Sequence, residues 1–193
     1  HRDALGSAEN RFASMPLVES LKEKARSAGL WNLFVPPDYA EYSDHGGMSF
    51  LDYAPLAEEM GRVIWSPEVF NCNAPDTGNM EVLERYGTQL HKDRWLGDLL
   101  AGRIRSAYVM TEPGLASSDA AQLAFEARRD GDDFILNGEK WWISGAGDPR
   151  CALYILMAST APEAAKHSRH TMFALDPKTP GIEVLRPMQV FGN

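Results

Sequence analysis

Residues 108–119 read Tyr-Val-Met-Thr-Glu-Pro-Gly-Leu-Ala-Ser-Ser-Asp, and residues 140–145 read Lys-Trp-Trp-Ile-Ser-Gly. The first stretch predicts a short apolar strand that breaks into a turn rich in hydroxyl groups and backbone amides. The second predicts an aromatic strand that ends in a small hydroxyl residue. A flat polar ring binds well where aromatic side chains contact its face and hydrogen-bonding groups contact its edge. The two stretches together can therefore bind such a ligand between them.

Upstream of these stretches the pattern is helical, because apolar residues from Met15 to about Gly102 recur at three- and four-residue steps. Residues 17–28 predict an amphipathic helix that stops at Gly29. The interval 35–47, rich in Pro, Gly and Asp, predicts no regular element. Three further helices are predicted to follow the capping residues Ser49, Asp76 and Thr88.

Past Arg103 the apolar period changes from about 3.6 to two, which favours strands. Hairpin turns are indicated by Asp-Gly-Asp at 130–132 and by Asn-Gly at 137–138. A run of helices followed by a run of strands predicts an α+β fold. We expect an N-terminal helical bundle over residues 1–104 and an antiparallel, β-barrel-like middle domain over residues 105–193. Its strands are predicted at residues 105–110, 122–128, 134–136, 139–144, 152–158, 171–175 and 182–185.

Composition excludes several classes of protein. The 193 residues carry a formal net charge of -8, whereas nucleic-acid binding needs a basic face, so no nucleic acid is expected as a partner. The two cysteines, Cys72 and Cys151, suggest neither a disulfide framework nor a zinc site. No apolar run reaches the roughly 18 residues needed to span a bilayer, so a soluble protein without membrane insertion is expected. Neither Gly-x-Gly-x-x-Gly nor a P-loop motif occurs, which disfavours a Rossmann fold or P-loop protein.

In this order, residues 108–119 and 140–145 resemble the flavin-binding signature of the acyl-CoA dehydrogenase family. In that family a Tyr-x-Val-Thr-Glu-Pro-Gly strand and turn and a Lys-x-Trp-Ile-Thr strand hold the isoalloxazine ring between them. The likeness runs along most of the chain and includes residues 73–79 and 186–188. It implies FAD as the cofactor and a fold whose C-terminal helical domain is absent from these 193 residues.

The resemblance also implies roles for single residues. Thr111 would bond the pyrimidine edge of the flavin, Tyr108 and Met110 would offer backbone groups, and Ser144 would bond near N5 beside Trp142. Ser144 replaces the Thr of the family, which keeps the hydroxyl group. The predicted cofactor-binding residues are Tyr108, Met110, Thr111, Ala116, Ser117, Trp142, Ile143 and Ser144. Taken singly, Thr111 reads as an ordinary turn residue and Trp142 as a core aromatic.

The loop after Gly114 departs from the Gly-x-Gly-Ser-Asp pattern that many family members show, because Ala116-Ser117-Ser118-Asp119 is one residue longer. This form resembles the branch described for long or branched acyl chains, including members fused to kinase-like domains. Ser117 and Ser118 are both candidates for contact with substrate, and either is also explained as a local turn or helix cap.

No catalytic residue is expected in this chain. In the family the base is a Glu or Asp of the C-terminal helical domain, so Glu112 and Asp119 are not assigned that role, and Glu112 is expected to bond backbone in its turn. His167 and His170 lie three residues apart in a polar loop without a nearby carboxylate or thiol, so no metal is expected there.

The resemblance implies the α,β-dehydrogenation of a fatty acyl-CoA in β-oxidation, with an electron-transferring flavoprotein as electron acceptor. It also implies a homo-oligomer, either dimer or tetramer, in the bacterial cytoplasm or in a eukaryotic mitochondrion or peroxisome. The fragment alone is expected to be inactive. Two alternatives stay open: an acyl-CoA or nitroalkane-type oxidase on the same scaffold, and a non-catalytic module that binds flavin or acyl-CoA.

Overall fold

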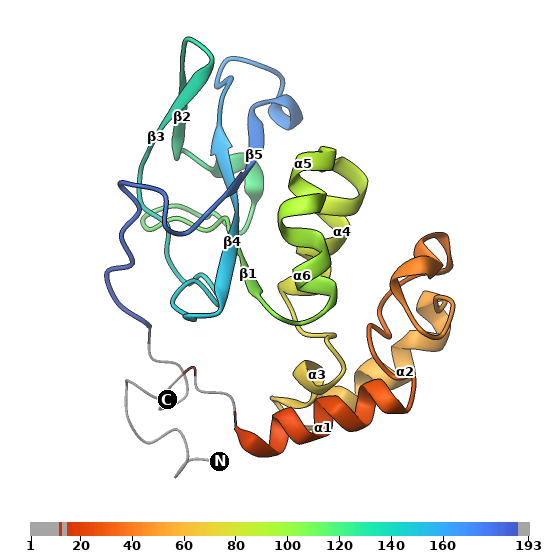
Figure 1. The fold of residues 1–193 in the computed structure, drawn as a ribbon. Coiled ribbons are helices and arrows are strands. Elements are labelled where there is room, and N and C mark those ends of the chain that lie inside the picture. Colours follow the sequence, from red (N-terminus) through yellow and green to blue (C-terminus); the bar gives the residue numbers. More distant parts are fainter. Residues whose placement is uncertain (1–11, 13–14, 189–193) are drawn as a thin grey trace. The chain divides into compact units, whose positions relative to one another are not determined.

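A computed structural model describes residue 12 and residues 15–188, which separate into two compact units (Figure 1). The helical unit comprises the described residues up to Tyr86 together with Leu96–Arg103. The β unit comprises Gly87–Trp95 and the described residues from Ile104 onward. The α+β class, with helices first and a sheet second, is therefore confirmed.

Helices of the first unit begin and end at local sequence signals. Pro16 opens the first helix, and Gly29, with φ of 68°, follows its end. Ser49 caps the second helix as predicted, because its hydroxyl accepts a hydrogen bond of 3.2 Å from the backbone N–H of Asp52. The elements are α1 (Pro16–Ser27), the 3-10 helix η2 (Pro37–Tyr42), α2 (Phe50–Gly61), α3 (Ser66–Val69), α4 (Asp76–Tyr86) and α6 (Gly97–Leu100).

Three local predictions for the helices were wrong in detail. The 3-10 helix η2 lies inside the interval predicted to hold no regular element. Asp76 is the first residue of α4 instead of the residue before it, and only 1% of it is exposed. The fourth predicted helix is divided into α5 (Gln89–His91), the π-helix η3 (Lys92–Leu96) and α6. Thr88 nevertheless caps α5 as predicted.

The division between the two units falls inside the π-helix η3, between Trp95 and Leu96. A π turn inserts one extra residue and so changes the direction in which the following side chains point. Trp95 is held by the β unit, because its indole N–H donates to the carbonyl of Ala152 at 3.0 Å. Arg94 adds an ion pair of 2.8 Å with Asp176. These contacts explain why a short helical segment belongs with the sheet.

Two buried asparagines organise the helical unit. Asn32 and Asn71 adopt φ of 58° and 54°, a region that favours Asn and Gly, and are 4% and 5% exposed. The amide of Asn71 donates to the side-chain oxygen of Asn32 at 2.7 Å and to the carbonyls of Leu99 and Leu100 at 3.0 and 3.2 Å. Asn32 donates to Leu100 as well, at 3.1 Å. The last carbonyls of α6 are thereby satisfied by side chains from two distant turns.

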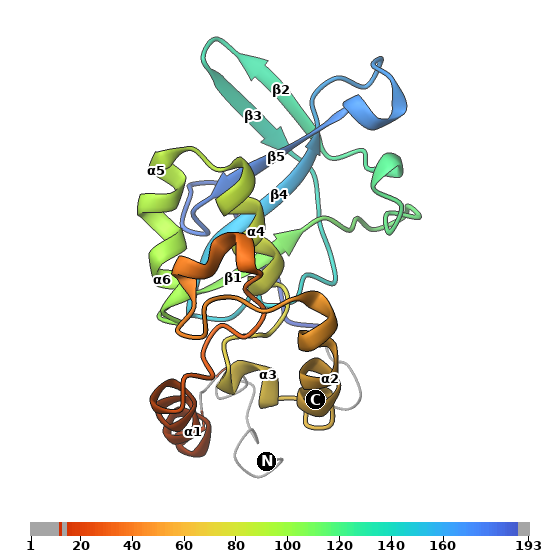
Figure 2. The same ribbon diagram turned by 90° about the vertical axis from the view of Figure 1, so that its right-hand side faces the viewer.

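The β unit is organised around its longest strand, β4, which has partners on both edges (Figures 1 and 2). Along one edge β5 runs antiparallel to β4. Along the other edge β1 pairs in parallel as far as Val109–Leu156, and β2 joins in parallel at Ser159. The antiparallel β2–β3 hairpin continues the sheet. The strands are β1 (Arg105–Val109), β2 (Glu126–Asp130), β3 (Asp133–Asn137), β4 (Cys151–Ser159) and β5 (His170–Leu175), with 3-10 helices η4 (Ala120–Gln122) and η5 (Lys166–Ser168) between them.

The sheet is therefore mixed, and the prediction of a purely antiparallel middle domain was wrong for the β1–β4 and β2–β4 pairs. The whole β2–β3 hairpin lies between β1 and β4 in sequence, and a connection of that length allows a parallel return. Two predicted strands are also missing, because residues 139–144 and 182–185 form no strand. Residues 122–125 lie outside β2, with Gln122 in η4.

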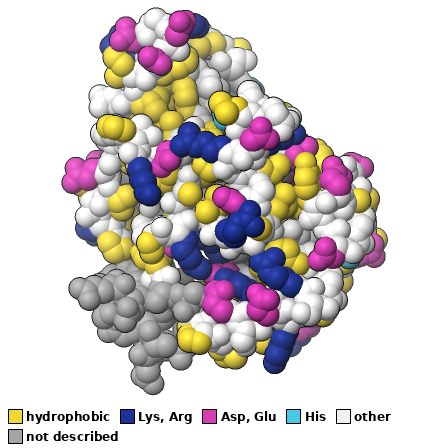
Figure 3. All heavy atoms as spheres, viewed as in Figure 1, with side chains coloured by type: hydrophobic (Ala, Val, Ile, Leu, Met, Phe, Trp, Pro, Cys, Tyr) yellow, Lys and Arg dark blue, Asp and Glu magenta, His cyan; other side chains and the backbone are white. Residues whose placement is uncertain are grey.

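One face of the sheet forms the core of the β unit, where Ala107, Val109, Tyr154 and Leu156 are buried together. The β2–β3 hairpin is less covered: in the view of Figure 3, apolar side chains gather at this end of the unit. Phe134 and Ile135 of β3 are 41% and 44% exposed. Acidic and basic side chains are interspersed over the face drawn there.

Candidate cofactor site

A hollow of about 540 Å³ lies in the β unit between the loop that follows β1 and the segment that precedes β4. The first wall is the loop from Thr111 to Asp119, and the second is the pair Trp141 and Trp142. This volume falls in the range of small-molecule and cofactor sites. The lining residues are Thr111, Leu115, Ala116, Ser117, Ser118, Asp119, Trp141 and Trp142.

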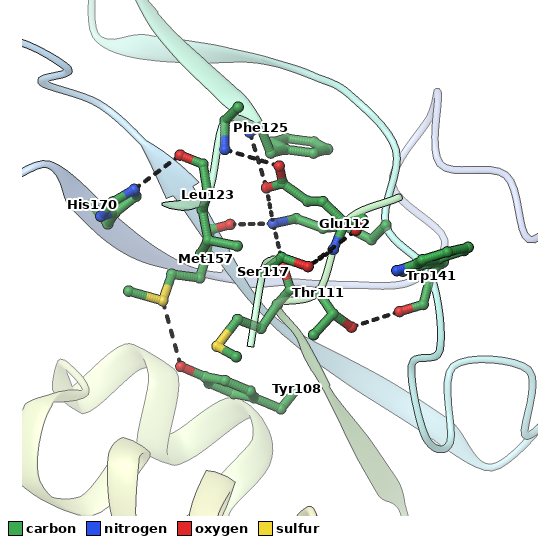
Figure 4. Close-up of polar contacts among 12 residues, drawn as sticks. Tyr108, Thr111, Glu112, Ser117, Leu123, Phe125, Trp141, Met157 and His170 are labelled. Atoms are coloured by element: carbon green, nitrogen blue, oxygen red, sulfur yellow. Dashed lines mark hydrogen bonds and ion pairs between the residues drawn. The ribbon is translucent and has the colours of Figure 1, made fainter. Parts of the chain in front are cut away.

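The two walls are joined directly by hydrogen bonds between Thr111 and Trp141 (Figure 4). The hydroxyl of Thr111 donates to the carbonyl of Trp141 at 2.7 Å, and the N–H of Trp141 donates to the carbonyl of Thr111 at 3.0 Å. Two stretches thirty residues apart are thus held side by side. As a result, Thr111 and Trp142 line the same hollow.

Trp142 has an unusual backbone conformation. Its φ is 55°, a region that a bulky residue rarely adopts and that costs about 1–2 kcal/mol. Half of the residue is exposed, as is 39% of Trp141, and the two ring centroids lie 6.2 Å apart. Strain of this kind gathers at functional sites. It also ends the extended backbone at this point, which is why the predicted strand over 139–144 does not form.

The loop of the first wall is closed by Ser117. Its hydroxyl accepts from the N–H of Glu112 at 2.7 Å and donates to the carbonyl of Glu112 at 3.0 Å. Ser117 is 4% exposed, whereas Ser118 is exposed. Asp119 accepts from the N–H of Ala121 at 3.0 Å, and this bond is the main cause of a lowered pKa of Asp119. Ser117 and Asp119 therefore shape the loop, whereas Ser118 is exposed and lines the hollow.

Behind the hollow lies a buried ion pair between Lys140 and Glu112, with side chains 6% and 5% exposed. The ammonium group donates to Glu112 Oε1 at 2.8 Å and to the carbonyls of Met110 and Met157 at 2.7 and 2.8 Å (Figure 4). All three N–H groups of Lys140 therefore have acceptors. The carboxylate also accepts from the N–H groups of Ala124 and Phe125, at 2.9 and 3.0 Å.

Burial of the pair affects both pKa values. Burial acts to raise the pKa of Glu112, but hydrogen bonds from Lys140 and from the amides of Ala124 and Phe125 outweigh it and hold this pKa below its ordinary value. Burial lowers the pKa of Lys140, and Glu112 opposes that change. Because a lowered carboxyl pKa stabilises the folded state above the ordinary pKa, this stability is lost as the pH falls through the folded-state pKa.

A pH prediction follows for Glu112→Gln. The wild-type β unit is expected to lose stability as the pH falls below about 4.5, and part of this loss should be missing in the variant, since Gln does not titrate. Urea denaturation at several pH values between about 3 and 7, monitored by tryptophan fluorescence, measures it. A stability difference between the two proteins that stays constant over this range would contradict the assigned pKa direction.

The structure brings five of the predicted site residues to the hollow: Thr111, Ala116, Ser117, Ser118 and Trp142. The others lie elsewhere in the β unit. The side chain of Tyr108 lies on β1 near the sulfur atoms of Met157 and Met172, with O–S distances of 3.7 and 3.9 Å. Burial raises the pKa of Tyr108.

The remaining three predicted residues have other surroundings. The carbonyl of Met110 accepts from Lys140. Ile143 packs against the core of the sheet, and Ser144 is exposed in the turn that follows Trp142. None of these three residues lines the hollow in the part of the chain that is described.

Sequence reasoning missed three lining residues, Leu115, Asp119 and Trp141. It also missed Lys140, which is bonded to Glu112 beside them. The signal for Trp141 was present in the doubled Trp, but a strand would have pointed these two rings to opposite faces. The positive φ of Trp142 allows both rings to reach the hollow. Across residues 12 and 15–188, no group of three His, Cys, Asp or Glu side chains is placed to hold a metal ion. None of the helices described is long and apolar enough to cross a membrane.

Comparisons with known proteins cover both parts of the chain. Residues 6–103 match the family model "Acyl-CoA dehydrogenase, N-terminal domain", and residues 107–193 match "Acyl-CoA dehydrogenase, middle domain". Mouse "Acyl-CoA dehydrogenase family member 10" is 47% identical over 187 residues, which cover 96% of this chain and 18% of that protein.

Two solved structures extend the likeness to three dimensions. A Mycobacterium abscessus protein described as an acyl-CoA dehydrogenase superposes with a TM-score of 0.91 at 49% identity, covering all of this chain and 47% of that one. A glutaryl-CoA dehydrogenase from Mycobacterium smegmatis in complex with FADH2 matches with a TM-score of 0.60 at 25% identity, covering 85% of this chain and 38% of that one. The chain thus spans less than half the length of these relatives.

Proposed function

The chain belongs to the acyl-CoA dehydrogenase family, and from this membership we propose that it holds FAD in the hollow between the loop 111–119 and Trp141–Trp142. Membership confirms the resemblance read from residues 108–119 and 140–145, and it implies flavin-dependent dehydrogenation. We assign to the complete protein the oxidation of an acyl-CoA thioester. One observation carries the assignment of the site: two exposed tryptophans, one of them with a strained backbone, and three hydroxyl-bearing residues line one hollow of suitable size.

The residues of the hollow suit a flavin by their chemistry. Tryptophan faces stack well on flat aromatic rings, and both indoles are accessible. The hydroxyl hydrogen of Thr111 is donated to Trp141, so its oxygen retains the capacity to accept from an N–H group such as that of the flavin pyrimidine edge. Ser118 lines the hollow and is exposed, and we propose that its hydroxyl group donates to the flavin, together with that of Ser144 in the turn after Trp142. The complex of the related glutaryl-CoA dehydrogenase with FADH2 supports this choice of cofactor.

When bound, FAD would supply the acceptor at N5 for a hydride from the β-carbon of the thioester, while a carboxylate would take the α-proton, and the product would be the trans-2-enoyl-CoA. The residues of this chain would orient the ring and keep water away from its face, which aligns the reacting bond. Tyr108, Met110, Ile143 and Ser144 are proposed to complete the cofactor contacts around the hollow. We propose that the loop segment Ser117–Ser118 contacts the substrate.

The remaining parts of the proposal concern the complete protein. We assign the catalytic base to a carboxylate outside these 193 residues, because Glu112 is occupied by Lys140 and two backbone amides and Asp119 by Ala121. An electron-transferring flavoprotein is the proposed electron acceptor. A dimer or tetramer is the proposed assembly.

The assignment is tested with the full-length protein, which is expected to be yellow and to release FAD on denaturation. Replacing Thr111 and Ser144 together by Val should raise the Kd for FAD by about tenfold, since each lost hydrogen bond contributes roughly 0.5–1.5 kcal/mol. Quenching of flavin fluorescence during titration of the apoprotein measures the Kd. Thr179→Val is the control, because the Thr179 hydroxyl bonds the Asp176 carbonyl outside the hollow.

A colourless protein that takes up no FAD would refute the proposed function. An unchanged Kd in the double variant would instead remove Thr111 and Ser144 from the site. Anaerobic mixing with substrate, followed by air, separates the alternatives. An acyl-CoA bleaches the flavin of a dehydrogenase or an acyl-CoA oxidase, and the dehydrogenase stays reduced longer in air. A nitroalkane-type oxidase is bleached by a nitroalkane instead, and a non-catalytic module by neither compound.

A further inference from the structure

We propose that Lys140 and Glu112 are positioning residues, whose buried ion pair sets the spacing between the two walls of the hollow and thereby the affinity for FAD. The inference rests on the proposed function, because it concerns the same site. Neither side chain lines the hollow. Both act through their sequence neighbours, Trp141 and Thr111, which do.

The first argument comes from the edge of β4. β1 pairs with β4 up to Val109–Leu156, and β2 takes over only at Ser159. The carbonyls of Met110 and Met157 lie in the interval between these two partners, and both accept from Lys140. The ammonium group of Lys140 thus lies at the edge of β4 between the end of its pairing with β1 and the start of its pairing with β2.

Glu112 gives the second argument, because it joins its own loop to two other segments. Its carboxylate accepts hydrogen bonds from the N–H groups of Ala124 and Phe125, which directly precede β2. Its own backbone N–H and C=O form hydrogen bonds with the hydroxyl group of Ser117. The ion pair with Lys140 links this assembly to the second wall. The first wall, the start of β2, β4 and the second wall therefore meet at one pair of charges.

Hydrogen bonds next to the ion pair show how its position can affect the hollow. Thr111 precedes Glu112 and Trp141 follows Lys140, and Thr111 and Trp141 are joined by two hydrogen bonds of 2.7 and 3.0 Å. The ion pair and this bridge form two consecutive links between the walls. A shift of one link moves the other, and with it the indoles that face the hollow.

A buried ion pair contributes little net stability compared with apolar side chains of similar size, whereas loss of one partner is costly because the other charge stays buried. Because of this asymmetry, a double variant without either charge can separate an effect on FAD affinity from an effect on stability alone. The double variant Lys140→Met/Glu112→Leu removes both charges but takes their partner from two carbonyls and two amides. It is therefore expected to melt below the wild type, but above the single variant Lys140→Met, in which the carboxylate stays buried without a counter-charge. Its two walls, however, keep only the bridge between Thr111 and Trp141 and lose the ion pair beside it.

The experiment compares FAD binding and melting temperature in full-length apoproteins. We expect the double variant to bind FAD on the order of tenfold more weakly than the wild type. In metalloproteins, loss of the residues that orient the metal ligands weakens metal binding by a similar factor. The single variant Lys140→Met should in addition melt about 10 °C or more below the wild type. Glu112→Gln, which keeps the shape of the side chain, should recover part of the affinity lost in the double variant.

Lys22→Met/Glu68→Leu is the matched control. Lys22 and Glu68 form a comparable ion pair of 2.7 Å in the helical unit, with side chains 11% and 21% exposed. This variant should leave the Kd for FAD within about twofold of the wild type. A similar loss of affinity in both double variants would show a general effect of stability and would overturn the inference.

A double variant of Lys140 and Glu112 that folds and binds FAD with the wild-type Kd would also overturn it, while the proposed function would stand. If that variant does not fold, Glu112→Gln decides, because an unchanged Kd there sinks the inference equally. Wild-type apoprotein that takes up no FAD would refute the proposed function itself.

Discussion

Replacing Trp142 by Gly is expected to lower the affinity for FAD by about thirty- to one hundredfold while changing stability little. A flavin stacked on one indole face would cover roughly 100 Å² of apolar surface, which contributes about 2–3 kcal/mol. Half of Trp142 is exposed, so the ring contributes little to the core. Glycine also relieves the positive φ of 55°, and this gain offsets its larger entropy in the unfolded chain.

Fluorescence titration with FAD and thermal unfolding of the apoprotein measure the two quantities separately. Phe134→Ala is a suitable control, because Phe134 is also a largely exposed aromatic of the β unit, at 41%, but lies outside the hollow. It should retain the wild-type Kd. If Trp142→Gly binds FAD as the wild type does, the indole has no place in the cofactor site.

Replacing Asn71 by Ala is expected to destabilise the helical unit by about 2–5 kcal/mol. The change removes the donor to the side-chain oxygen of Asn32, and leaving a buried polar group without a partner costs about 1–3 kcal/mol. The carbonyls of Leu99 and Leu100 also lose a bond, but each keeps another donor. Alanine at φ of 54° adds about 1–2 kcal/mol of backbone strain. Denaturant unfolding monitored by circular dichroism measures the loss.

Asn71→Gly separates the two causes, because Gly accepts the positive φ but cannot make the hydrogen bonds. It should be destabilised by roughly 0.5–1 kcal/mol less than the Ala variant. Both variants should bind FAD as the wild type does at temperatures where they are folded, since Asn71 belongs to the helical unit and does not line the hollow. Two variants as stable as the wild type would show that the asparagine network does not stabilise this unit.

Local signals in the sequence predicted local structure well. The helix over residues 17–28, the caps at Ser49 and Thr88 and the turn at Gly131 depend on residues within one or two turns of each other, and all four are present. The π-helix at Lys92–Leu96 was not predicted, because its cause is distant. Trp95 is drawn to the carbonyl of Ala152, which no pattern around Trp95 reveals.

Strand pairing shows the same limit. Alternation located most strands, but it says nothing about which strands are neighbours, so the parallel pairing of β1 with β4 was beyond its reach. It also read residues 139–144 as a strand, whereas Lys140 turns inward to an ion pair and Trp142 adopts a positive φ. Bonds to partners about thirty residues away outweighed the local preference for extended backbone.

By itself, the sequence determined the α+β order, the family and the two stretches that meet at the hollow, because periodicity, caps and short motifs are properties of neighbouring residues. Only the tertiary structure decided which side chains face the hollow and which stand behind it. Ser117, Lys140 and Glu112 carry polar groups that a ligand could use, yet each is taken up by a partner brought close by folding. A buried polar group must be satisfied by whatever the fold places beside it, and that neighbour is fixed by chain topology and not by sequence distance.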